Sequence, residues 1–534
     1  MLPPDAHLAS HEVENQPLPR GARDLWADDT ALRHWSGAMG AREAALAAAG
    51  AAFGTDEALE WANEARRDPP RLDLFDRTGR RRDEVRFNAA YHELMALGLG
   101  HGYAACAWDR APGGHATHAA LVYMFAQLEP GVCCPMTMTY AGIPALRAAG
   151  FGDWADKLAV PAYDPAIAPL AAKRAVTLGM AMTEKQGGSD VRANTTRAEP
   201  DGEAWRLTGH KWFCSAPMSD GFLTLAQGPG GLTCFLVPRW LEGGRNALRI
   251  QRLKDKLGNH ANASSEIEYH DTLSWQVGAP GQGVRTIIEM VHHTRLDTAL
   301  APAGLMRAAI AEAHWWVSGR SAFQRRLIDQ PLMRAVLADL ALDAEAALAL
   351  GMISARAYDG TTVADAAFAR IAVALAKYLN NKRCPVVCVE AMECLGGMGY
   401  VEETPMPMLY REAPLNGIWE GSGNVICLDI MRTLAREPLA GEVLASFLQA
   451  ATGADRRFDA ALAAHLARWP GLPPESEARW FAESAATLLA AAALIRHGDA
   501  AVADAYAATR LTGQRGQVPG ALPGMDVAAI LDRL

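Results

Sequence analysis

The amino-acid sequence predicts an α+β fold in which helical domains flank a middle β domain. Apolar residues recur at helical spacing before about residue 175 and after about residue 285, whereas the stretch between contains short runs of β-forming residues. The chain has 534 residues, 50% of them hydrophobic, so it can bury several cores. We divide it into an N-terminal helical domain with a leading arm (1–175), a middle β domain (176–285), a helical domain (286–437) and a helical C-terminal extension (438–534).

The first part of the chain, from Asp29 to about residue 175, is predicted to be mostly helical. Its alanine-rich segments are interrupted by Gly50 and Gly54, which separate one helix from the next. The segment 86–99 carries apolar residues near helical spacing. Glycines at 98, 100 and 102 predict that this helix ends there.

Runs of β-forming residues, separated by Gly, Pro, Asp and Asn, begin after residue 175. The segment 266–269 alternates polar and apolar residues, as a half-exposed strand does. We interpret four runs as strands of one compact β domain: 205–208, 222–226, 233–237 and 266–269.

Helical periodicity returns at about Val284. Within 331–349, apolar residues lie three or four positions apart and form a single stripe. A second long helix is predicted over 363–394, because two consecutive glycines at 396 and 397 end the pattern. The C-terminal extension is predicted to be helical, with breaks at the proline-rich segment 470–474 and at 513–523.

Composition and charge argue against several kinds of partner. The net charge is −9 and the pI is near 5.9, so DNA or an anionic membrane would need a local basic patch. The nine cysteines form no CxxC pair and have small apolar neighbours, which predicts buried free thiols in a reducing cytoplasm and no metal site. We recognise no secretory signal, and the longest apolar run, 488–495, is shorter than the ~20 residues of a membrane span. We therefore expect a soluble, cytoplasmic protein.

Two motifs more than two hundred residues apart carry the chemistry. The first, Met-Thr-Glu-Lys-Gln-Gly-Gly-Ser-Asp at 182–190 with Lys-Trp-Phe-Cys-Ser at 211–215, offers hydroxyls, small residues and free backbone N–H groups. Such groups suit the edge of a flat ring and a pyrophosphate. The second, at 418–424, places Glu420 beside Trp419 and before a flexible Gly-Ser-Gly turn. Together they indicate a bound flavin with a carboxylate base opposite it, although the first motif alone also fits a hairpin connection.

Six strings in this order, MTEKQGGSDV, NTTRAE, GHKWF, LKDKLGN, LGGMGY and IWEGSGN, resemble the acyl-CoA dehydrogenase superfamily and, within it, the AidB branch associated with DNA alkylation stress. The resemblance covers about residues 15–432 and continues more weakly to the C-terminus. It implies a helical N-terminal domain, a middle β domain and a C-terminal domain like a four-helix bundle. It also implies FAD as cofactor, a homotetramer, and a small acyl thioester as substrate.

Several cofactor contacts follow from the resemblance. Met182, Thr183 and Ser215 line the flavin ring, whereas Gly188 and Ser189 meet the phosphates. Phe213 stands where the family usually has a tryptophan over the flavin, and its alternative role is that of a core aromatic residue in a strand. The other implied flavin contacts are Phe323, Trp419, Gly421, Ser422 and Asn424.

Two further cofactor contacts are implied in the helical C-terminal half. Arg320 resembles the arginine that pairs with the cofactor pyrophosphate, for which a planar guanidinium is suited; its alternative role is that of a surface arginine. Gly396 and Gly397 belong to a string that, in the family, lies against the cofactor of a neighbouring subunit. Alone, the string is an ordinary helix end followed by a turn.

Glu420 matches the position of the family's catalytic base. Removal of a thioester's α-proton while a hydride moves to the flavin needs a base on the opposite face, and burial raises a carboxylate's pKa towards the working range. The alternative is a glutamate that hydrogen-bonds locally in a turn, since bulky Trp419 narrows the pocket. Arg295 matches a family arginine near the substrate and is predicted to bind it, although Asp297 beside it departs from the expected pattern.

The resemblance to the AidB branch also suggests weak DNA binding, with the C-terminal extension as the candidate DNA-binding region. Residues 438–534 contain eight Arg, no Lys and ten Asp or Glu, so the segment is net negative. No zinc-finger or helix-turn-helix signature is recognised. The hypotheses are therefore a dehydrogenase with Glu420 as base, or a stress-response flavoprotein that acts mainly through DNA. The candidate DNA contacts are Arg456, Arg457, Arg468, Arg510 and Arg515.

Overall fold

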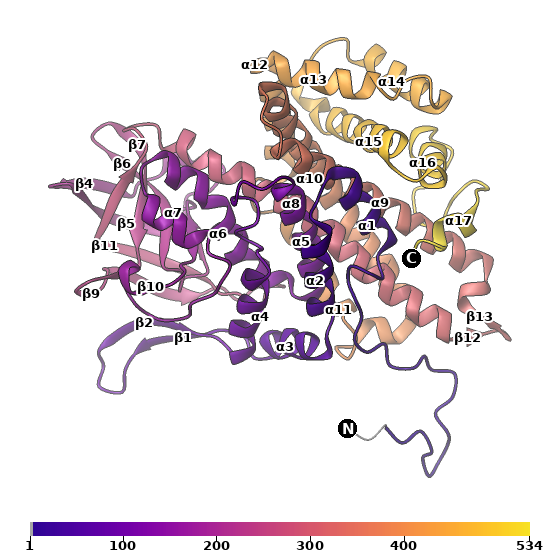
Figure 1. Ribbon diagram of the computed structural model, residues 1–534, viewed down its shortest axis with the longest axis horizontal. Coiled ribbons are helices and arrows are strands. Elements are labelled where there is room, and N and C mark those ends of the chain that lie inside the picture. Colours follow the sequence, from indigo (N-terminus) through magenta and orange to yellow (C-terminus); the bar gives the residue numbers. More distant parts are fainter. Residues whose placement is uncertain (1–3) are drawn as a thin grey trace.

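The computed structural model describes residues 4–534. A β domain lies at one end, a body of long helices lies beside it, and helices of the C-terminal extension cover one side of the body (Figure 1). This arrangement confirms the predicted α+β class. The end of the chain that begins at residue 4 runs away from the body as an extended arm.

The N-terminal part is mainly helical. Its helix α5 is buried along its whole length, because α8 and α9 pack against it. The helix predicted over 86–99 is α4, which ends at a glycine as expected. The helices are α1 Thr30–Met39, α2 Glu43–Phe53, α3 Asp56–Arg67, α4 Ala89–Gly100, α5 Gly114–Leu128, α6 Pro130–Ala148 and α7 Gly152–Leu158.

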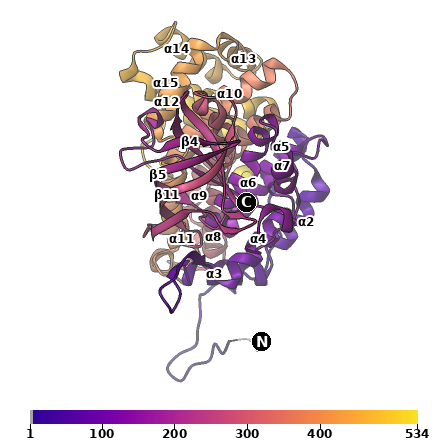
Figure 2. The ribbon, with the colours of Figure 1, turned by 90° about the vertical axis from the view of Figure 1, so that its left-hand side faces the viewer.

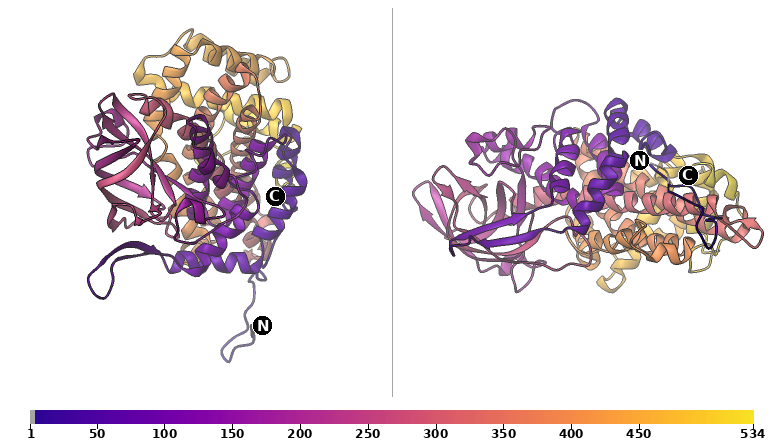
Figure 3. Two further views of the ribbon diagram at one scale, coloured as in Figure 1. Left: turned by 60° about the vertical axis from the view of Figure 1, so that its left-hand side comes forward. Right: turned by 90° about the horizontal axis from the view of Figure 1, so that it is seen from below.

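A hairpin that the sequence did not predict interrupts these helices. Strands β1 (Arg71–Phe75) and β2 (Arg81–Arg86) pair antiparallel. At the turn, one carboxylate oxygen of Asp76 accepts the N–H groups of Thr78 and Arg80 at 2.8 and 2.9 Å, and Gly79 adopts a left-handed φ of 83°. The hairpin projects beside the β domain (Figure 3).

The β domain is a seven-stranded sheet that faces the viewer in Figure 2. Its strand order is β10-β11-β5-β4-β6-β3, and β7 joins β6 to β11. The four predicted runs lie within β5, β6, β7 and β11, so this prediction is confirmed. The strands of this sheet are β3 Leu178–Ala181, β4 Arg197–Asp201, β5 Ala204–Ser215, β6 Gly221–Gly228, β7 Gly231–Pro238, β10 Leu248–Leu253 and β11 Ser264–Val277; β8 Trp240–Leu241 pairs with β9 Gly244–Arg245.

Three long helices form the body, and each packs against the other two: α8 (Gly283–Gly319), α9 (Pro331–Tyr358) and α10 (Val363–Cys394). The predicted span of α10 is confirmed, because a Thr362 capping box starts the helix and Gly396 follows its end with a left-handed φ of 61°. The connections are β12 Ser321–Ala322, β13 Arg325–Arg326, the 3₁₀ turns η4 Gly396–Tyr400 and η5 Leu415–Gly417, and α11 Met406–Glu412.

The C-terminal extension is bonded into the body. In it, α15 packs against α9 and α10. The helical segment Glu475–His497 is long and apolar enough to cross a membrane, and it is longer than the apolar run 488–495 noted in the sequence. In the structure, however, 67% of its most apolar window is buried inside the protein, as in a core helix. The helices of the extension are α13 Pro438–Gln449, α14 Arg456–Arg468, α15 Ala478–His497, α16 Ala500–Tyr506 and α17 Val527–Leu531; α12 Gly423–Arg436 precedes them and belongs to the helical domain.

Candidate active site

Glu420 lies in the short segment between η5 and α12, in an uncommon backbone conformation. Its φ is 54°, and Gly421 follows with a φ of 100°. A left-handed glutamate costs roughly 1–2 kcal/mol, so the surrounding structure must hold it there. Residues kept in such conformations cluster at functional sites.

Lys377 of α10 fixes this segment through hydrogen bonds to its backbone. Its buried ammonium donates to the carbonyl oxygens of Asn416, Trp419 and Gly421 at 2.7, 3.0 and 3.2 Å. Burial lowers the pKa of Lys377 to about 7, although the nearby Glu420 carboxylate opposes that change. One side chain thus fixes the carbonyls on both sides of the candidate base. No sequence motif pointed to it.

The Glu420 carboxylate points towards α8. Thr294 donates its hydroxyl to Glu420 Oε2 at 2.8 Å. Burial raises the pKa of Glu420, while the Thr294 hydrogen bond and the charges of Lys377 and Arg295 partly offset this rise. A carboxylate with a raised pKa and one fixed hydrogen bond suits a general base.

Arg295 does not extend towards a substrate as predicted. It is buried, its Nε donates to the Glu420 carbonyl at 3.2 Å, and its NH1 meets Asp429 at 2.6 Å. Arg370 binds the other oxygen of Asp429 at 2.8 Å. This is a correction to the sequence-based role: the guanidinium is taken up by an internal ion pair, so Arg295 supports the backbone of the base instead.

The first motif forms an edge of the β domain. Ser215 ends β5 opposite Ser264 of β11, with their hydroxyls 3.3 Å apart. The carbonyl of Thr183 accepts the Trp212 N–H at 2.8 Å, which joins the turn to the strand. A Cβ on Gly188 would lie 2.4 Å from Thr183 Oγ1, so the turn needs glycine there. Ser189 is exposed just beyond it.

A buried ion pair fixes this turn, and the sequence analysis missed it. Glu184 accepts the Lys211 ammonium at 2.8 Å, and both side chains are fully buried. The Glu184 carboxylate also accepts the backbone N–H groups of Thr195 and Thr196. Burial would raise the pKa of Glu184, but Lys211 and these bonds lower it well below its usual range. Glu184 lies in the string MTEKQGGSDV and Lys211 in the string GHKWF. Their opposite charges within these motifs were the signal from which the pair could have been predicted.

The two motifs meet at Cys134 of α6. This buried thiol lies next to the Ser215 hydroxyl and the Asn262 amide, with the charges of Lys256 and Glu420 close by. Burial raises its pKa to about 12, so it stays protonated. Ser215 and Glu420 therefore both influence this thiol, and their roles beside a flavin stay a prediction.

Orphaned polar atoms at this site fit a flavin edge. Asn262 is 1% exposed, and within residues 4–534 neither its amide oxygen nor its amide nitrogen has a hydrogen-bond partner. Lys256 donates to the Asn262 carbonyl at 2.6 Å. Burial lowers the pKa of Lys256 to about 8. A buried amide without partners is costly, and a heterocycle with both donors and acceptors would satisfy it.

Other predicted flavin contacts have protein partners in the structure. Trp419 donates its indole N–H to Asn416 at 2.7 Å, and the Met182 carbonyl accepts from Asn194 at 2.9 Å. Ser422 is the exposed residue before α12. The Asn424 amide oxygen accepts from Arg479 of α15 at 3.1 Å. Phe213 is 48% exposed, with the Lys254 ammonium 4.7 Å from its ring centre.

A second group of predicted cofactor residues lies far from Ser215 in the same chain. Arg320 follows α8 about 25 residues after Thr294, which is roughly 38 Å along a helix. It donates to the Asn15 carbonyl at 2.9 Å. Phe323, 94% exposed, lies with Arg320 at the β12–β13 end of the body, opposite the β domain (Figure 1). Gly396 and Gly397 begin η4, about 19 residues beyond Lys377, and α11 after it contacts the β domain where the Asn259 N–H donates to Glu412.

The arginines predicted to contact DNA are mostly held in ion pairs, and their contact with DNA stays a prediction. Arg510 and Arg515 bind Asp339 of α9, at 2.6 and 2.8 Å. Arg457 pairs with Asp455 and, at 2.6 Å, with Asp504. The Arg468 guanidinium stacks 3.9 Å from the Trp480 ring centre. Arg456 is exposed at the start of α14. The part of the chain from residue 4 onward also holds no group of three side chains suited to a metal ion.

Comparison with known proteins gives matches along most of the chain. Family models match as the adaptive response protein AidB N-terminal domain (residues 15–165), the acyl-CoA dehydrogenase middle domain (179–272) and the acyl-CoA dehydrogenase C-terminal domain (281–435). The chain is 45% identical over 467 residues to the putative acyl-CoA dehydrogenase AidB of Escherichia coli (strain K12), covering 85% of this chain and 86% of that one.

Solved structures have the same architecture. Caenorhabditis elegans ACDH-11 in complex with C11-CoA superposes with a TM-score of 0.82 and 26% identity, covering 99% of this chain and 97% of the other. An acyl-CoA dehydrogenase complexed with FAD from Bacillus anthracis gives 0.63 at 18% identity, covering 80% and 77%; it supports the fold alone.

Proposed function

Because this chain belongs to the acyl-CoA dehydrogenase family, as a relative of AidB, we propose that it oxidises an acyl thioester with Glu420 as the base. It is an FAD-dependent enzyme of acyl-CoA dehydrogenase type. The observation that carries the proposal is the carboxylate of Glu420 itself. It has a raised pKa, is fixed by Thr294, and its charge acts on Cys134, the buried thiol beside Ser215.

The residues of the chain divide the work of this reaction. Bound FAD would supply the acceptor for the hydride that leaves the β-carbon of the thioester. Glu420 takes the α-proton, and the electron pair of the broken Cα–H bond forms the Cα=Cβ double bond. Thr294 and Lys377 hold the carboxylate and its backbone in place during this transfer. Thr183, Ser215 and Asn262 would hold the polar edge of the ring.

The test is anaerobic mixing of the purified protein with a panel of acyl-CoAs, following flavin bleaching. Glu420→Gln should keep FAD and lose bleaching by about 10²–10⁴-fold, because the amide has nearly the same shape and cannot take a proton. Glu403→Gln, an exposed glutamate in the same helical part, should bleach at the parent rate. Equal rates in the parent and Glu420→Gln would assign the base to another residue.

The proposal includes a homotetramer in which neighbouring chains complete the cofactor site. The separation of Arg320 from Thr294 and Glu420 within one chain supports it, since α8 places Arg320 roughly 38 Å along the helix from Thr294. Arg320→Ala should lower FAD retention while the mass in solution stays that of the assembly. A monomer that holds FAD tightly would contradict this arrangement.

A cytoplasmic location is part of the same proposal. Within residues 4–534 all nine cysteines are free, and eight of them are buried. Free thiols are typical of a reducing compartment. Cell fractionation with the tagged protein would test the location, and recovery from the periplasm would contradict it.

A further inference from the structure

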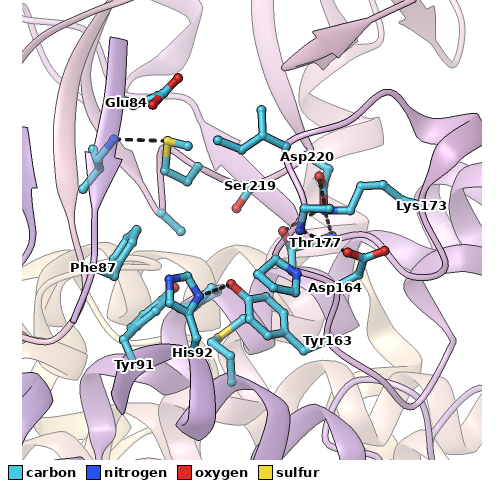
Figure 4. A pocket seen from close by; sticks show the side chains of 18 of the residues that line it. Glu84, Phe87, Tyr91, His92, Tyr163, Asp164, Lys173, Thr177, Ser219 and Asp220 are labelled. Carbon is cyan, nitrogen blue, oxygen red and sulfur yellow. Dashed lines mark hydrogen bonds and ion pairs between the residues drawn. The ribbon is translucent and has the colours of Figure 1, made fainter. Parts of the chain in front are cut away.

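A second cavity lies where the N-terminal helices meet the β domain (Figure 4). Its volume is about 350 Å³, within the ~300–1,000 Å³ range of small-molecule pockets. The segments around it are the end of β2 with the start of α4, the loop 163–167, and the turn 216–220. Among residues 4–534, the lining contains neither Glu420 nor Ser215. Pro135 and Ala216, which line it, directly follow Cys134 and Ser215, so the cavity adjoins the candidate active site and does not include its base.

One wall of the cavity is aromatic and fixed. Phe87 and Tyr91 stack with ring centres 3.9 Å apart and an interplanar angle of 16°. His92 stacks on Tyr163, and its Nδ1 lies 2.9 Å from the Tyr163 hydroxyl. Burial lowers the pKa of His92, so the imidazole is neutral near pH 7. These rings hold one another in position, which provides a preformed surface for a flat or branched apolar group.

Ser219 presents an unsatisfied hydroxyl to this cavity. The residue is 3% exposed, and its Oγ has no hydrogen-bond partner in the described part of the chain. In Figure 4 it lies between the aromatic side chains and the Lys173–Asp220 pair. An unpaired buried hydroxyl costs about 1–3 kcal/mol. A ligand that hydrogen-bonds to Ser219 would remove that cost.

The charges around the cavity leave one carboxylate without a side-chain counterion. Lys173 pairs with Asp220 at 2.6 Å, Glu84 pairs with Arg245, and Arg86 pairs with Asp73 at 2.6 Å. Asp164 instead accepts two backbone N–H groups, both at 3.0 Å, and no salt bridge to it is present in residues 4–534, although the charges of Lys173 and Arg174 act on it from farther away. A carboxylate has lone pairs for further donors. The lining therefore favours a cation over an anion.

We propose that this cavity binds a small aromatic or branched organic amine. Its apolar part packs against Phe87 and Tyr91, and its ammonium end meets Asp164 and Ser219. The net negative lining disfavours an acyl thioester with its phosphate groups, so the ligand is not the substrate of the Glu420 site. The proposal therefore stands apart from the dehydrogenase function.

The test uses the full-length protein with FAD bound and three probes of similar shape: 2-phenylethylamine, 2-phenylethanol and 3-phenylpropionate. Titration calorimetry should show saturable binding of the amine, about tenfold weaker binding of the alcohol because it lacks the charge-assisted bond, and the weakest binding for the carboxylate. Carboxylate binding as tight as that of the amine, or no binding of any probe, would overturn the proposal.

Three variants locate the ligand. Asp164→Asn should abolish the preference for the amine over the alcohol, and Ser219→Ala should weaken both about fivefold, the loss of one hydrogen bond. Ile167→Trp, at a position that is 53% exposed and so tolerates bulk, should block all three probes. Glu420→Gln is the matched control and should bind the amine like the parent. Amine binding unchanged in all three cavity variants would place the ligand elsewhere and sink the assignment.

Discussion

At the scale of single residues, Lys377 is one of the groups that lower the pKa of the proposed base against the effect of burial. Its ammonium favours the ionised form of Glu420, so it offsets part of the rise that burial causes. The reaction needs ionised Glu420, so the acid limb of the rate–pH profile follows the pKa of this group. Lys377→Met should therefore move that limb to higher pH by about one unit, the lower end of the usual effect of a nearby opposite charge.

Arg436→Met is the control for this prediction. Arg436 is an exposed residue at the end of α12, and its charge is screened by solvent. Its removal should leave the acid limb in place. Rates measured from about pH 5 to pH 9 with one acyl-CoA would compare the two variants, and an equal displacement in both would remove the specific role of Lys377.

At the scale of elements, the Glu184–Lys211 pair fastens the first motif to β5. Removal of one partner leaves the other charge buried and unpaired, which typically costs about 3–5 kcal/mol. Lys211→Met should lower the free energy of unfolding by that amount in urea titrations. Lys185→Met, an exposed lysine in the same turn, should change it by less than ~1 kcal/mol. Similar losses for both would mean that the pair adds little.

Elements with a regular apolar pattern could be predicted from the sequence, and those held by charge could not. The span of α10 followed from a helical stripe and a glycine stop. The β1–β2 hairpin was missed because residues 71–86 are rich in arginine and aspartate. These charged residues form ion pairs with one another, so the segment lacks the alternation of polar and apolar residues that predicts a strand. The Asp-Arg-Thr-Gly turn at 76–79 was the signal that was available.

The same difference applies to the active site. Glu420 and Ser215 stand in recognisable strings, so their meeting was predictable. Lys377 donates to backbone carbonyls, and the residues before it in α10 are apolar. No pattern of side chains in the sequence therefore points to its role. Arg295 occupies the expected place in the sequence, but only the structure shows that Asp429 takes its charge.

At the scale of the whole molecule, the charge distribution predicts weak DNA association that depends strongly on salt. The net charge is −9, and of the candidate arginines Arg456 is exposed whereas Arg510 and Arg515 are ion-paired. Each phosphate contact adds about −0.9 to the slope of log affinity against log salt, so even a few contacts lose affinity steeply as salt rises, and their small number keeps the affinity low. Gel shifts should fade before physiological salt. Tight binding at physiological salt that is abolished by Arg456→Glu would contradict this prediction and favour a protein that acts mainly through DNA.

Because the C-terminal extension packs against α9 and α10 and forms ion pairs with α9, it is not an independent domain. The ion pairs of Asp339 and Asp343 with Arg510 fasten it, and the apolar face of α15 covers the two long helices. A chain truncated at residue 437 would expose that covered surface to water, and large exposed apolar patches promote aggregation. We expect such a truncation to accumulate as insoluble protein, so any role of the extension is better sought by charge reversal at its surface than by deletion.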